Sequence, residues 1–366
     1  MKFSVARGEL SESLAVASRG LSARSTLPIL SGILVSCDGE KVTFQTTDLE
    51  VSVRTHVSGL VEESGQTVIP GRLFTEIVRN LPEAAVTVEV ERETAVVSCG
   101  NASFTLKTLS PDDFPRFPEV QVDTWVQLPS EVVSGIVRQV ARAVSRDETR
   151  AILTGILLSV DGPTMKMVAT DSYRLAVSET VLSEPAPENL EVVIPGKALE
   201  EVMKLAQGVD SLSLGVTENQ IVFEMGDTTF VTRRIEGSYP NYRALIPKEY
   251  ETGVTVASED VRAAVKRVSL LAQHNASIRL AVQVEDQTLS LSAATQDVGD
   301  ASEDLMAKAT GQDVEIAFNH SFLNDGLAAI QTDELVVEIT SPLKPGVIKP
   351  VGAEGFLYLL MPVRLG

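Results

Sequence analysis

The sequence is poor in the residue types on which many catalytic and metal-binding sites depend. Its 366 residues include two cysteines, Cys37 and Cys99, and three histidines, His56, His274 and His320. Two cysteines cannot build a disulfide framework or a cysteine-rich metal cage, and they fit a reducing compartment, so we expect a cytoplasmic protein. The histidines stand in unrelated contexts without metal-ligand spacing, so we expect no metal site and no cofactor.

Long apolar runs are also missing. No stretch approaches the ~20 apolar residues that a membrane-spanning helix needs, and the segment Met1-Lys2-Phe3-Ser4 opens into polar residues without a signal-peptide core. The hydrophobic fraction of 44% and the charged fraction of 22% are those of a soluble globular protein. The length suffices for two or three domains.

Positive charge is scarce. The chain has 31 Lys and Arg residues against 50 Asp and Glu residues, which gives a formal net charge of −19. This balance excludes a protein that coats nucleic acid over its whole surface. It does not exclude a protein that concentrates its cations on one face.

Short motifs of common enzyme classes do not occur. Gly196-Lys197 lacks the upstream glycine of a phosphate-binding loop and is followed by Ala198 instead of Ser or Thr. The sequence contains no G-x-S-x-G or H-E-x-x-H segment. These absences leave no nucleophile, general base or cofactor motif on which to build a catalytic mechanism.

Two remaining groups of reactive side chains have ordinary structural interpretations. Asp297, Asp300, Glu303 and Asp304 could hold a cation, but we interpret them as a solvated loop. The two cysteines lie in apolar, strand-like surroundings, where we expect small buried side chains.

The dominant feature of the chain is an internal repeat. Four segments of the first third recur in the same order in the second third, at offsets of 123 to 125 residues. The recurring pairs are Thr26–Gly39 with Thr149–Gly162, Thr47-Asp48 with Thr170-Asp171, Ile69–Val78 with Ile194–Met203, and Phe114–Phe117 with Tyr239–Tyr242. A fainter third copy contains Ala294-Thr295 and Phe318–Leu323. We therefore expect three similar domains, 1–120, 121–246 and 247–366, joined by short connectors.

Each repeat shows the same order of hydrophobic periodicities. An opening helix is followed by alternating β-branched runs, such as Lys41–Val53, and then by a second helix that begins at Pro-Gly. The apolar positions expected to face the core are Leu10, Leu14, Ala17 and Leu21 in the first opening helix, Val133, Val137, Val140 and Val144 in the second, Val261, Ala264 and Val268 in the third, and Leu73, Phe74, Ile77, Val78 and Leu81 in the first Pro-Gly helix. The pattern predicts an α+β fold with two helices packed on antiparallel sheets in each of three tandem domains.

Lys and Arg recur at matched positions of these helices. Aligned at offsets of 123 and 124, Arg19, Arg142 and Lys266 share one position, which lies ~200° around the helix from apolar Ala17 and so points away from the core. Arg262 similarly repeats Arg138. The cations expected on outward helix faces are Arg19, Arg72, Arg79, Arg138, Arg142, Arg146, Lys197, Lys204 and Lys266.

This cation pattern has two explanations. Exposed helix faces commonly carry Lys and Arg, and charge patterning alone is a weak signal. In a chain short of cations, however, the matched repetition favours a basic surface that faces a phosphate backbone. Because the sequence offers no aromatic stacking platform and no base-reading helix, such contact should not depend on nucleotide sequence.

Four motifs spread over the whole chain resemble one family. They are Thr26-Leu-Pro-Ile-Leu30, Ala169-Thr-Asp-Ser-Tyr-Arg-Leu-Ala176, Tyr239-Pro-Asn-Tyr242 and Met361-Pro-Val-Arg-Leu365. In this order they are similar to the bacterial DNA polymerase III sliding clamp, the beta subunit. The resemblance implies a DNA clamp fold and a head-to-tail homodimeric ring that encircles duplex DNA. It also implies a processivity factor without catalytic activity of its own, which tethers the replicative DNA polymerase and is loaded by a clamp loader.

The same resemblance implies several functional residues. A groove for short partner peptides would contain Arg150, Leu153, Thr170, Ser172, Tyr173, Arg174, Leu175, Pro240, Leu245, Leu359, Met361, Pro362, Val363 and Arg364. The subunit interface would join Phe104 and Leu106 to Leu270 and Leu271, and Arg24 would lie in a loop that can touch DNA. Many relatives have glycine and histidine where this chain has Ser172 and Tyr173.

Two other classes of function remain as alternatives. An enzyme could use Asp171 and the 297–304 carboxylates on the triplicated scaffold, although no motif supports it. A structural ring that does not bind DNA is the other alternative, and charge alone does not distinguish it from a ring that binds DNA.

Overall fold

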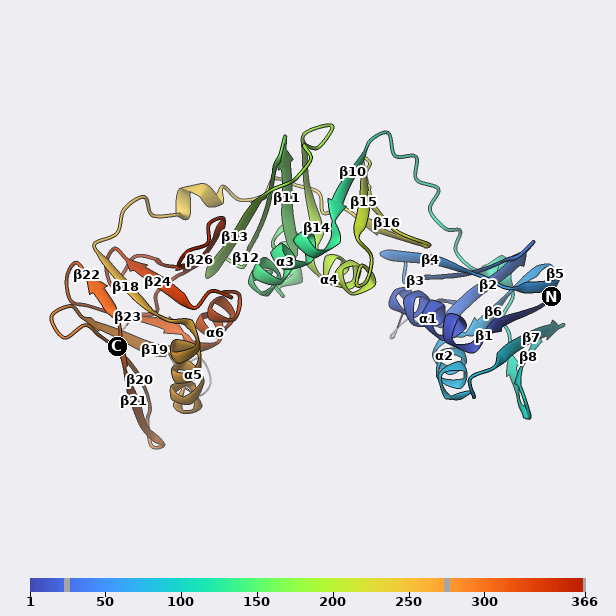
Figure 1. Ribbon diagram of the computed structural model, residues 1–366, viewed down its shortest axis with the longest axis horizontal. Coiled ribbons are helices and arrows are strands. Elements are labelled where there is room, and N and C mark those ends of the chain that lie inside the picture. Colours follow the sequence, from blue (N-terminus) through green and yellow to red (C-terminus); the bar gives the residue numbers. More distant parts are fainter. Residues whose placement is uncertain (23–26, 273–276, 365–366) are drawn as a thin grey trace. The chain divides into compact units, whose positions relative to one another are not determined.

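The computed structural model describes residues 1–22, 27–272 and 277–364, and in these residues each repeat contains two α-helices and a series of antiparallel strands (Figure 1). The helices are α1 (Arg7–Ala17), α2 (Gly71–Asn80), α3 (Ser130–Val140), α4 (Gly196–Leu205), α5 (Ser258–Val268) and α6 (His320–Ala328). Short 3-10 helices are η1 (Ser18–Gly20), η2 (Pro28–Ser31), η3 (Pro111–Asp113), η4 (Ala141–Ala143), η5 (Glu148–Thr154), η6 (Tyr242–Leu245) and η7 (Ser269–Leu271).

Each repeat contributes eight or nine of the described β-strands. The first repeat has β1 (Lys2–Ala6), β2 (Gly32–Asp38), β3 (Lys41–Thr47), β4 (Val51–Ser58), β5 (Leu60–Glu63), β6 (Gly65–Pro70), β7 (Ala85–Glu91), β8 (Thr94–Cys99) and β9 (Ala102–Lys107). The second has β10 (Trp125–Pro129), β11 (Gly155–Asp161), β12 (Thr164–Thr170), β13 (Arg174–Val181), β14 (Leu190–Pro195), β15 (Ser211–Val216), β16 (Gln220–Met225) and β17 (Thr228–Arg233). The third has β18 (Thr252–Ala257), β19 (Ser277–Gln283), β20 (Thr288–Thr295), β21 (Gly299–Met306), β22 (Lys308–Thr310), β23 (Val314–Asn319), β24 (Glu334–Ile339), β25 (Gly346–Pro350) and β26 (Phe356–Leu360).

Two large sheets each combine strands from two neighbouring repeats. One has the order β10-β15-β16-β17-β4-β3-β2-β6, and its β17–β4 pair places Val231 opposite Ser52. The other has the order β14-β11-β12-β13-β26-β25-β24-β18-β22, and its β13–β26 pair places Leu175 opposite Leu359. Backbone hydrogen bonds therefore run continuously from one repeat into the next at both places.

The two remaining sheets in the described residues end in strands that have a partner on one side only. These sheets have the orders β5-β1-β7-β8-β9 and β21-β20-β19-β23. Thus β9 of the first repeat and β21 of the third repeat are both edge strands.

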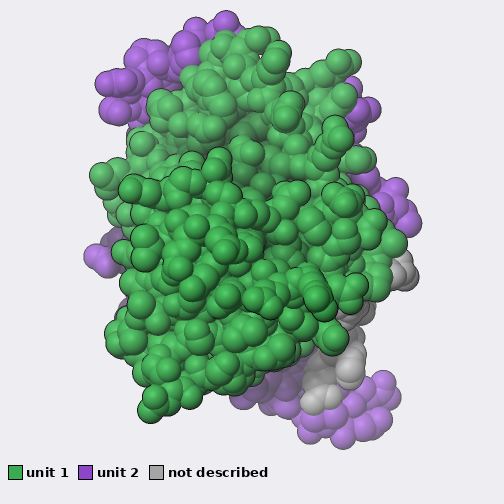
Figure 2. Space-filling model, turned by 90° about the vertical axis from the view of Figure 1, so that its right-hand side faces the viewer, with its two compact units in different colours: residues 1–131, 197–234 green, residues 132–196, 235–366 purple. Residues whose placement is uncertain are grey.

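The described chain divides into two compact units, which Figure 2 colours separately. Unit 1 contains residues 1–131 and 197–234, and unit 2 contains residues 132–196 and 235–366. Each unit holds one of the large sheets, because strand pairing between repeats is as extensive as pairing within them.

The core of the first repeat confirms the predicted helix faces, with one exception. Helix α1 packs against α2 and β4, and Leu10, Leu14 and Ala17 are fully buried. Phe74 and Val78 of α2 are also fully buried, but Leu73 is 48% exposed, so its predicted place in the core was wrong. Leu73 is ~100° around the helix from Phe74, and the core reaches only the Phe74–Val78 side.

Both cysteines are buried and unpaired, as predicted. They belong to the core cluster of the first repeat, and burial is the main reason why the pKa of the Cys37 thiol lies above its ordinary value.

The repeated Thr-Asp motif builds the same turn in the first two repeats. The Asp48 carboxylate accepts hydrogen bonds from the backbone N–H groups of Glu50 and Val51, at 3.0 and 2.7 Å. Asp171 likewise accepts from Tyr173 and Arg174, at 2.9 and 3.0 Å. Leu49 and Ser172, which follow the two aspartates, have φ values of +78° and +79°. Ser172 thus adopts a backbone conformation that favours glycine, the residue expected there in many relatives.

The third repeat requires a correction to the predicted alignment of cations. Helices α1, α3 and α5 begin at Arg7, Ser130 and Ser258, so the second offset between opening helices is 128 residues and not 124. Lys266 therefore matches Arg138, and the residue that matches Arg19 and Arg142 is Leu270. The prediction was wrong by four residues, about one helical turn, and a shift of that size preserves the apolar periodicity of a helix.

The acidic cluster of the third repeat is not a loop as a whole. Asp300, Glu303 and Asp304 lie on β21, where Glu303 forms an ion pair with Arg267 and Asp304 accepts a hydrogen bond from Ser290 at 2.6 Å. The described residues contain no group of His, Cys, Asp and Glu side chains suited to a metal ion. None of the described helices is both long and apolar enough to cross a membrane.

Two helical glycines, one in the third repeat and a control in the second, allow a test of the packing of α6. A Cβ atom at Gly326 of α6 would lie 2.3 Å from the ring of fully buried Tyr358, whereas one at Gly135 of α3 would meet no atom within 4 Å. We expect Gly326→Ala to lower the free energy of unfolding by about 1–3 kcal/mol through overpacking. The control Gly135→Ala should raise it by roughly 0.4–1 kcal/mol. Urea titrations of both variants measure these changes, and equal effects would contradict the described packing.

Candidate functional site

An apolar surface lies where β13 meets β26. Leu175 and Leu359 face each other across this strand pair and are both fully or nearly fully buried. They belong to one cluster with Tyr242 of η6 and Val347 of β25. Three segments that are distant in sequence thus supply a single apolar cluster, the floor of this surface.

The rim of this floor carries exposed side chains. Leu245 and Met361 are 48% and 41% exposed, and Tyr173 is 60% exposed. The chain is held in place here because the backbone N–H of Met361 donates to the Tyr173 carbonyl at 2.9 Å. An accessible apolar rim above a buried apolar floor is suited to a hydrophobic peptide side chain.

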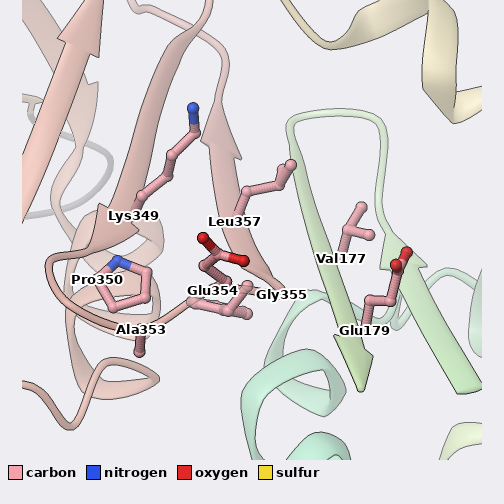
Figure 3. Close-up of a pocket in the computed structure, with 9 residues that line it drawn as sticks. Val177, Glu179, Lys349, Pro350, Ala353, Glu354, Gly355 and Leu357 are labelled. Carbon is pink, nitrogen blue, oxygen red and sulfur yellow. The ribbon is translucent and has the colours of Figure 1, made fainter. Parts of the chain in front are cut away.

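The same face of the sheet continues beyond the floor. Val177 and Leu357 are the next inward-facing pair on β13 and β26, and they line a pocket with Glu179, Glu354 and Lys349 (Figure 3). In Figure 3 the two apolar side chains lie between the charged groups.

Arg174 has a structural role that sequence analysis did not foresee. Its guanidinium contacts the Asp171 carboxylate at 2.9 Å, Asp325 at 2.6 Å and the Tyr358 hydroxyl at 3.2 Å. It also lies over the Phe322 ring, 4.4 Å from the centroid. Burial alone would lower the pKa of Arg174, but Tyr358, Asp325 and Asp171 together raise it above its ordinary value. The side chain joins the end of β13 to α6 and is largely inaccessible to a peptide.

The side chains around Arg174 form a closed network. Tyr173 stacks on Phe322 with ring centroids 6.3 Å apart, and the Tyr358 hydroxyl donates to the Phe322 carbonyl at 3.0 Å. Burial raises the pKa of Tyr358, so the hydroxyl stays protonated and can donate. The network fixes the position of Tyr173 at the rim of the apolar surface.

Arg150 approaches the site from η5. It donates to Asp147 at 3.1 Å and to the Ser172 hydroxyl at 3.0 Å, and it is exposed. Hydrogen bonds from Thr149, followed by those from Arg150, lower the pKa of Asp147. Arg150 is therefore a cation of this region that remains accessible to a ligand's carboxylate or backbone carbonyl.

The other predicted groove residues divide by accessibility. Leu153 and Thr170 are buried, and the Thr170 hydroxyl donates to the Arg174 carbonyl at 2.6 Å. Val363 is partly exposed and its N–H donates to the Ala317 carbonyl at 2.8 Å. The remaining residues, Pro240, Pro362 and Arg364, lie at least partly exposed on the flanking segments.

The predicted DNA-facing cations that the structure describes are all exposed. In unit 1 they are Arg19, Arg72, Arg79, Lys197 and Lys204, and in unit 2 they are Arg138, Arg142, Arg146 and Lys266. Arg24 lies outside the described residues.

Several of these cations have carboxylate partners. Glu201 of α4 contacts Arg19 at 3.2 Å and Lys204 at 2.6 Å. Asp325 of α6 contacts Arg142 at 3.1 Å in addition to Arg174. The basic helix faces are thus partly neutralised by acidic side chains on neighbouring helices.

The predicted interface residues lie at the two edge strands and beside them. Phe104 and Leu106 are on β9, and Phe104 is 41% exposed. Leu270 and Leu271 are in η7, next to β21, and Leu270 is 73% exposed. Each of the two predicted interface segments therefore carries an exposed large apolar side chain.

Asp325, Phe322 and Tyr358 were the functional-site residues that sequence analysis missed. The equivalence of Asp325 with Glu201 at an offset of 124 residues was the available signal. The other two residues carry no repeat signature, because their contact with Arg174 depends on the junction of two repeats.

Tandem α+β repeats, joined edge to edge by their sheets and carrying basic helix faces, define a DNA clamp fold of three tandem domains. The sequence matches the N-terminal, central and C-terminal domains of the DNA polymerase III beta subunit at residues 1–118, 127–241 and 243–364. The chain belongs to this family, the bacterial beta sliding clamps.

Individual relatives agree over their whole length. The beta sliding clamps of Synechococcus elongatus and Streptomyces coelicolor are 34% and 35% identical over 374 and 377 residues, with 100% of each chain covered. The crystal structure of the DNA polymerase sliding clamp from Bacillus subtilis superposes with a TM-score of 0.95 at 30% identity, again over 100% of both chains.

The Arg174 network yields a stability prediction. Arg174→Met leaves Asp171 without its cation and Asp325 with the exposed Arg142 as its remaining cation, and it should lower the free energy of unfolding by about 3 kcal/mol, as for other broken buried pairs. The control Arg150→Met removes an exposed pair and should cost less than about 1 kcal/mol. Chemical denaturation measures both changes. Comparable losses in the two variants would show that Arg174 does not stabilise the junction.

Proposed function

We propose that this sliding clamp works as a head-to-tail homodimeric ring that encircles duplex DNA and tethers a replicative polymerase. It catalyses no reaction itself and acts in the cytoplasm on DNA. A tether keeps the polymerase at a high effective concentration near the primer end, so rebinding becomes intramolecular and synthesis becomes processive. A clamp loader would open the ring, and other proteins with similar peptide motifs would share its groove.

One observation carries the proposal of a ring. The strand pairing between neighbouring repeats occurs twice within the chain, and the two strands that would form it a third time are both edge strands. Strand β4 pairs with β17, and its equivalent β13 pairs with β26. The next equivalents in the repeat are β21 and β9, and these are the edge strands. Pairing β21 of one subunit with β9 of the partner subunit would repeat the junction twice and leave neither edge free.

The repeat also gives a register for this pairing. Transferring the β17–β4 register places Phe104 opposite Ala301 of the partner subunit and Leu106 opposite Gly299 of the partner subunit. Small side chains on β21 thus leave room for the larger apolar side chains of β9. Leu270 and Leu271 lie beside β21, where they could cover the pair.

DNA contact in this proposal uses charge alone. The predicted cations that the structure describes lie on α-helices or 3-10 turns, except Arg146, which lies in the segment after η4, and Glu201 and Asp325 reduce the local charge. Contacts to phosphates without base readout fix no sequence preference and allow movement along the duplex.

A first prediction concerns assembly. Changing Leu270 and Leu271 together to Ala should give a folded monomer, because the variant loses two apolar side chains at each junction. Light scattering should give twice 39.3 kDa for the unaltered chain and 39.3 kDa for the variant. A variant that remains dimeric at micromolar concentration would contradict this interface.

A second prediction concerns DNA. The unaltered clamp, once loaded, should be retained on nicked circular duplex and lost from linear duplex, because retention is topological. Arg72→Glu with Arg79→Glu should impair loading or retention and leave the melting temperature nearly unchanged, since both residues are exposed. The matched control reverses Lys248 and Lys344, two exposed cations outside the predicted set. Equal retention of the helix variant and its control at low salt would argue against a basic DNA-facing surface.

A third prediction concerns the peptide groove. Met361→Ala should cost about 1–3 kcal/mol of affinity for a polymerase-derived peptide, the usual scale for an interface anchor. Leu343→Ala is the control, since Leu343 is exposed to a greater extent but lies outside the groove. Calorimetry with the dimer measures both. If Met361→Ala binds the peptide as tightly as its control, the groove lies elsewhere.

A further inference from the structure

A separate hollow adjoins the apolar floor on the same face of the sheet. Val177 and Leu357 line this pocket, which has a volume of about 380 Å³ (Figure 3). They lie opposite each other on β13 and β26, two residues along each strand from the pair Leu175 and Leu359. Two residues of a strand span roughly 7 Å. An extended peptide with an apolar anchor on the floor therefore reaches the pocket with a residue two or three positions from that anchor.

The pocket combines an apolar base with carboxylates at its sides. Val177 belongs to the apolar cluster of the floor, and Leu357 packs against the same cluster. Glu179 follows on β13, and Glu354 lies in the segment before β26. In Figure 3 the two apolar side chains lie between these two carboxylates. This arrangement suits a long basic side chain, because its methylene stem packs on apolar surface while its charged head reaches a carboxylate.

Glu354 is the carboxylate of the pocket that remains available to a ligand. Its side chain is exposed and forms no ion pair with any other residue that the structure describes. The Glu179 carboxylate, in contrast, contacts Lys166 at 2.5 Å. The pocket also contains one cation, Lys349, but its ammonium group contacts Glu338 at 2.6 Å. The charge that a ligand meets in the pocket is therefore negative.

The segment that carries Glu354 is held against β13. The backbone N–H of Glu179 donates to the Gly355 carbonyl at 2.6 Å. Gly355 has a φ of +88°, and a Cβ atom there would collide with the Glu179 carbonyl, so this close approach requires glycine. The wall of the pocket is thus formed before a ligand binds, which lowers the entropic cost of binding.

The first junction shows that the sheet does not require apolar residues at these positions. By the 123-residue offset of the Thr-Asp motif, Arg54 of β4 is the equivalent of Val177, and Thr229 of β17 lies opposite Arg54. Arg54 and Thr229 line a polar hollow, in which His56 and Asp227 are 3.0 Å apart. Of the two internal junctions, the second is therefore the one that offers an apolar base beside carboxylates.

We propose that the pocket extends the peptide groove and selects partner peptides that carry a lysine or arginine two or three residues from their apolar anchor. The stem of the basic side chain lies on Val177 and Leu357, and its charged head pairs with Glu354. The inference rests on the proposed peptide groove and adds to it a preference for positive charge. The occupant is the peptide of a tethered protein, because the pocket is continuous with the floor on which the anchor of that peptide would lie.

A series of peptides tests this preference. A polymerase-derived peptide is synthesised with arginine, norleucine or glutamate at each position within three residues of its apolar anchor, on either side. At one of these positions arginine should bind the full-length clamp about three- to fivefold more tightly than norleucine, which is the scale of an exposed ion pair. Glutamate should bind more weakly than norleucine at the same position. Calorimetry measures the dissociation constants, and the advantage of arginine should decrease as the salt concentration rises.

Two variants of the clamp assign the preference to Glu354. Glu354→Gln should remove the advantage of arginine and leave the affinity for the norleucine peptide unchanged. Glu354→Lys should reverse the order of the arginine and glutamate peptides, which a purely structural role of this residue would not do. Glu259→Gln is the matched control, since Glu259 is an exposed carboxylate of α5 outside the pocket. Because Glu354 is exposed, thermal unfolding should show that both variants remain folded.

The outcomes separate the pocket from the proposed groove. If Met361→Ala weakens the binding of none of the peptides, the groove itself fails. If Met361→Ala weakens binding but arginine gives no advantage at any position, the groove stands and its extension into the pocket is wrong. An advantage of arginine that persists in Glu354→Gln would also overturn the inference.

Discussion

Hydrogen bonding between the sheet edges of neighbouring repeats is the constraint on which the rest of the molecule depends. The β4–β17 and β13–β26 pairs make each large sheet continuous across two repeats, so the division into compact units follows sheets and not repeats. The apolar surface proposed to bind peptides exists only because β13 and β26 are adjacent, since Leu175 comes from one strand and Leu359 from the other. The same constraint leaves β9 and β21 with free edges, and an exposed edge of this kind favours association with another chain.

Arg174 shows how such a junction also fixes side chains. One guanidinium bridges the carboxylates of two repeats and lies on the Phe322 ring, so the rotation of α6 relative to β13 is determined by direct contacts. Buried ion pairs of this kind give little net stability over apolar packing but a strong penalty when one partner is lost. The network joins the two repeats at the junction, and the stack on Phe322 holds Tyr173 at the rim of the apolar surface.

Much of this architecture could be predicted from the sequence, because repeats preserve periodicity. Leu10, Leu14 and Ala17 were placed in the core, and the Thr-Asp motif was found as a repeat, which in the structure is the same turn in the first two repeats. Periodicity failed where it is degenerate: a helix displaced by one turn keeps its apolar face, so Lys266 was matched to the wrong residues. Contacts between repeats, such as that of Arg174 with Asp325, were not predicted, because the periodicity within one repeat does not show which side chains of the next repeat lie against it.

The paired cations bear on how a strongly acidic protein can hold DNA and still move along it. Arg19 and Arg142 occupy the same position in the first two repeats, and both are partly neutralised by a carboxylate of the next repeat. Each phosphate contact adds to affinity through release of counterions, so a surface of fully free cations would bind tightly and slow any movement. A ring that retains DNA by topology needs no such affinity. Glu201 and Asp325 join neighbouring repeats, and in the proposed ring their carboxylates would also weaken the electrostatic attraction between the helix cations and phosphate.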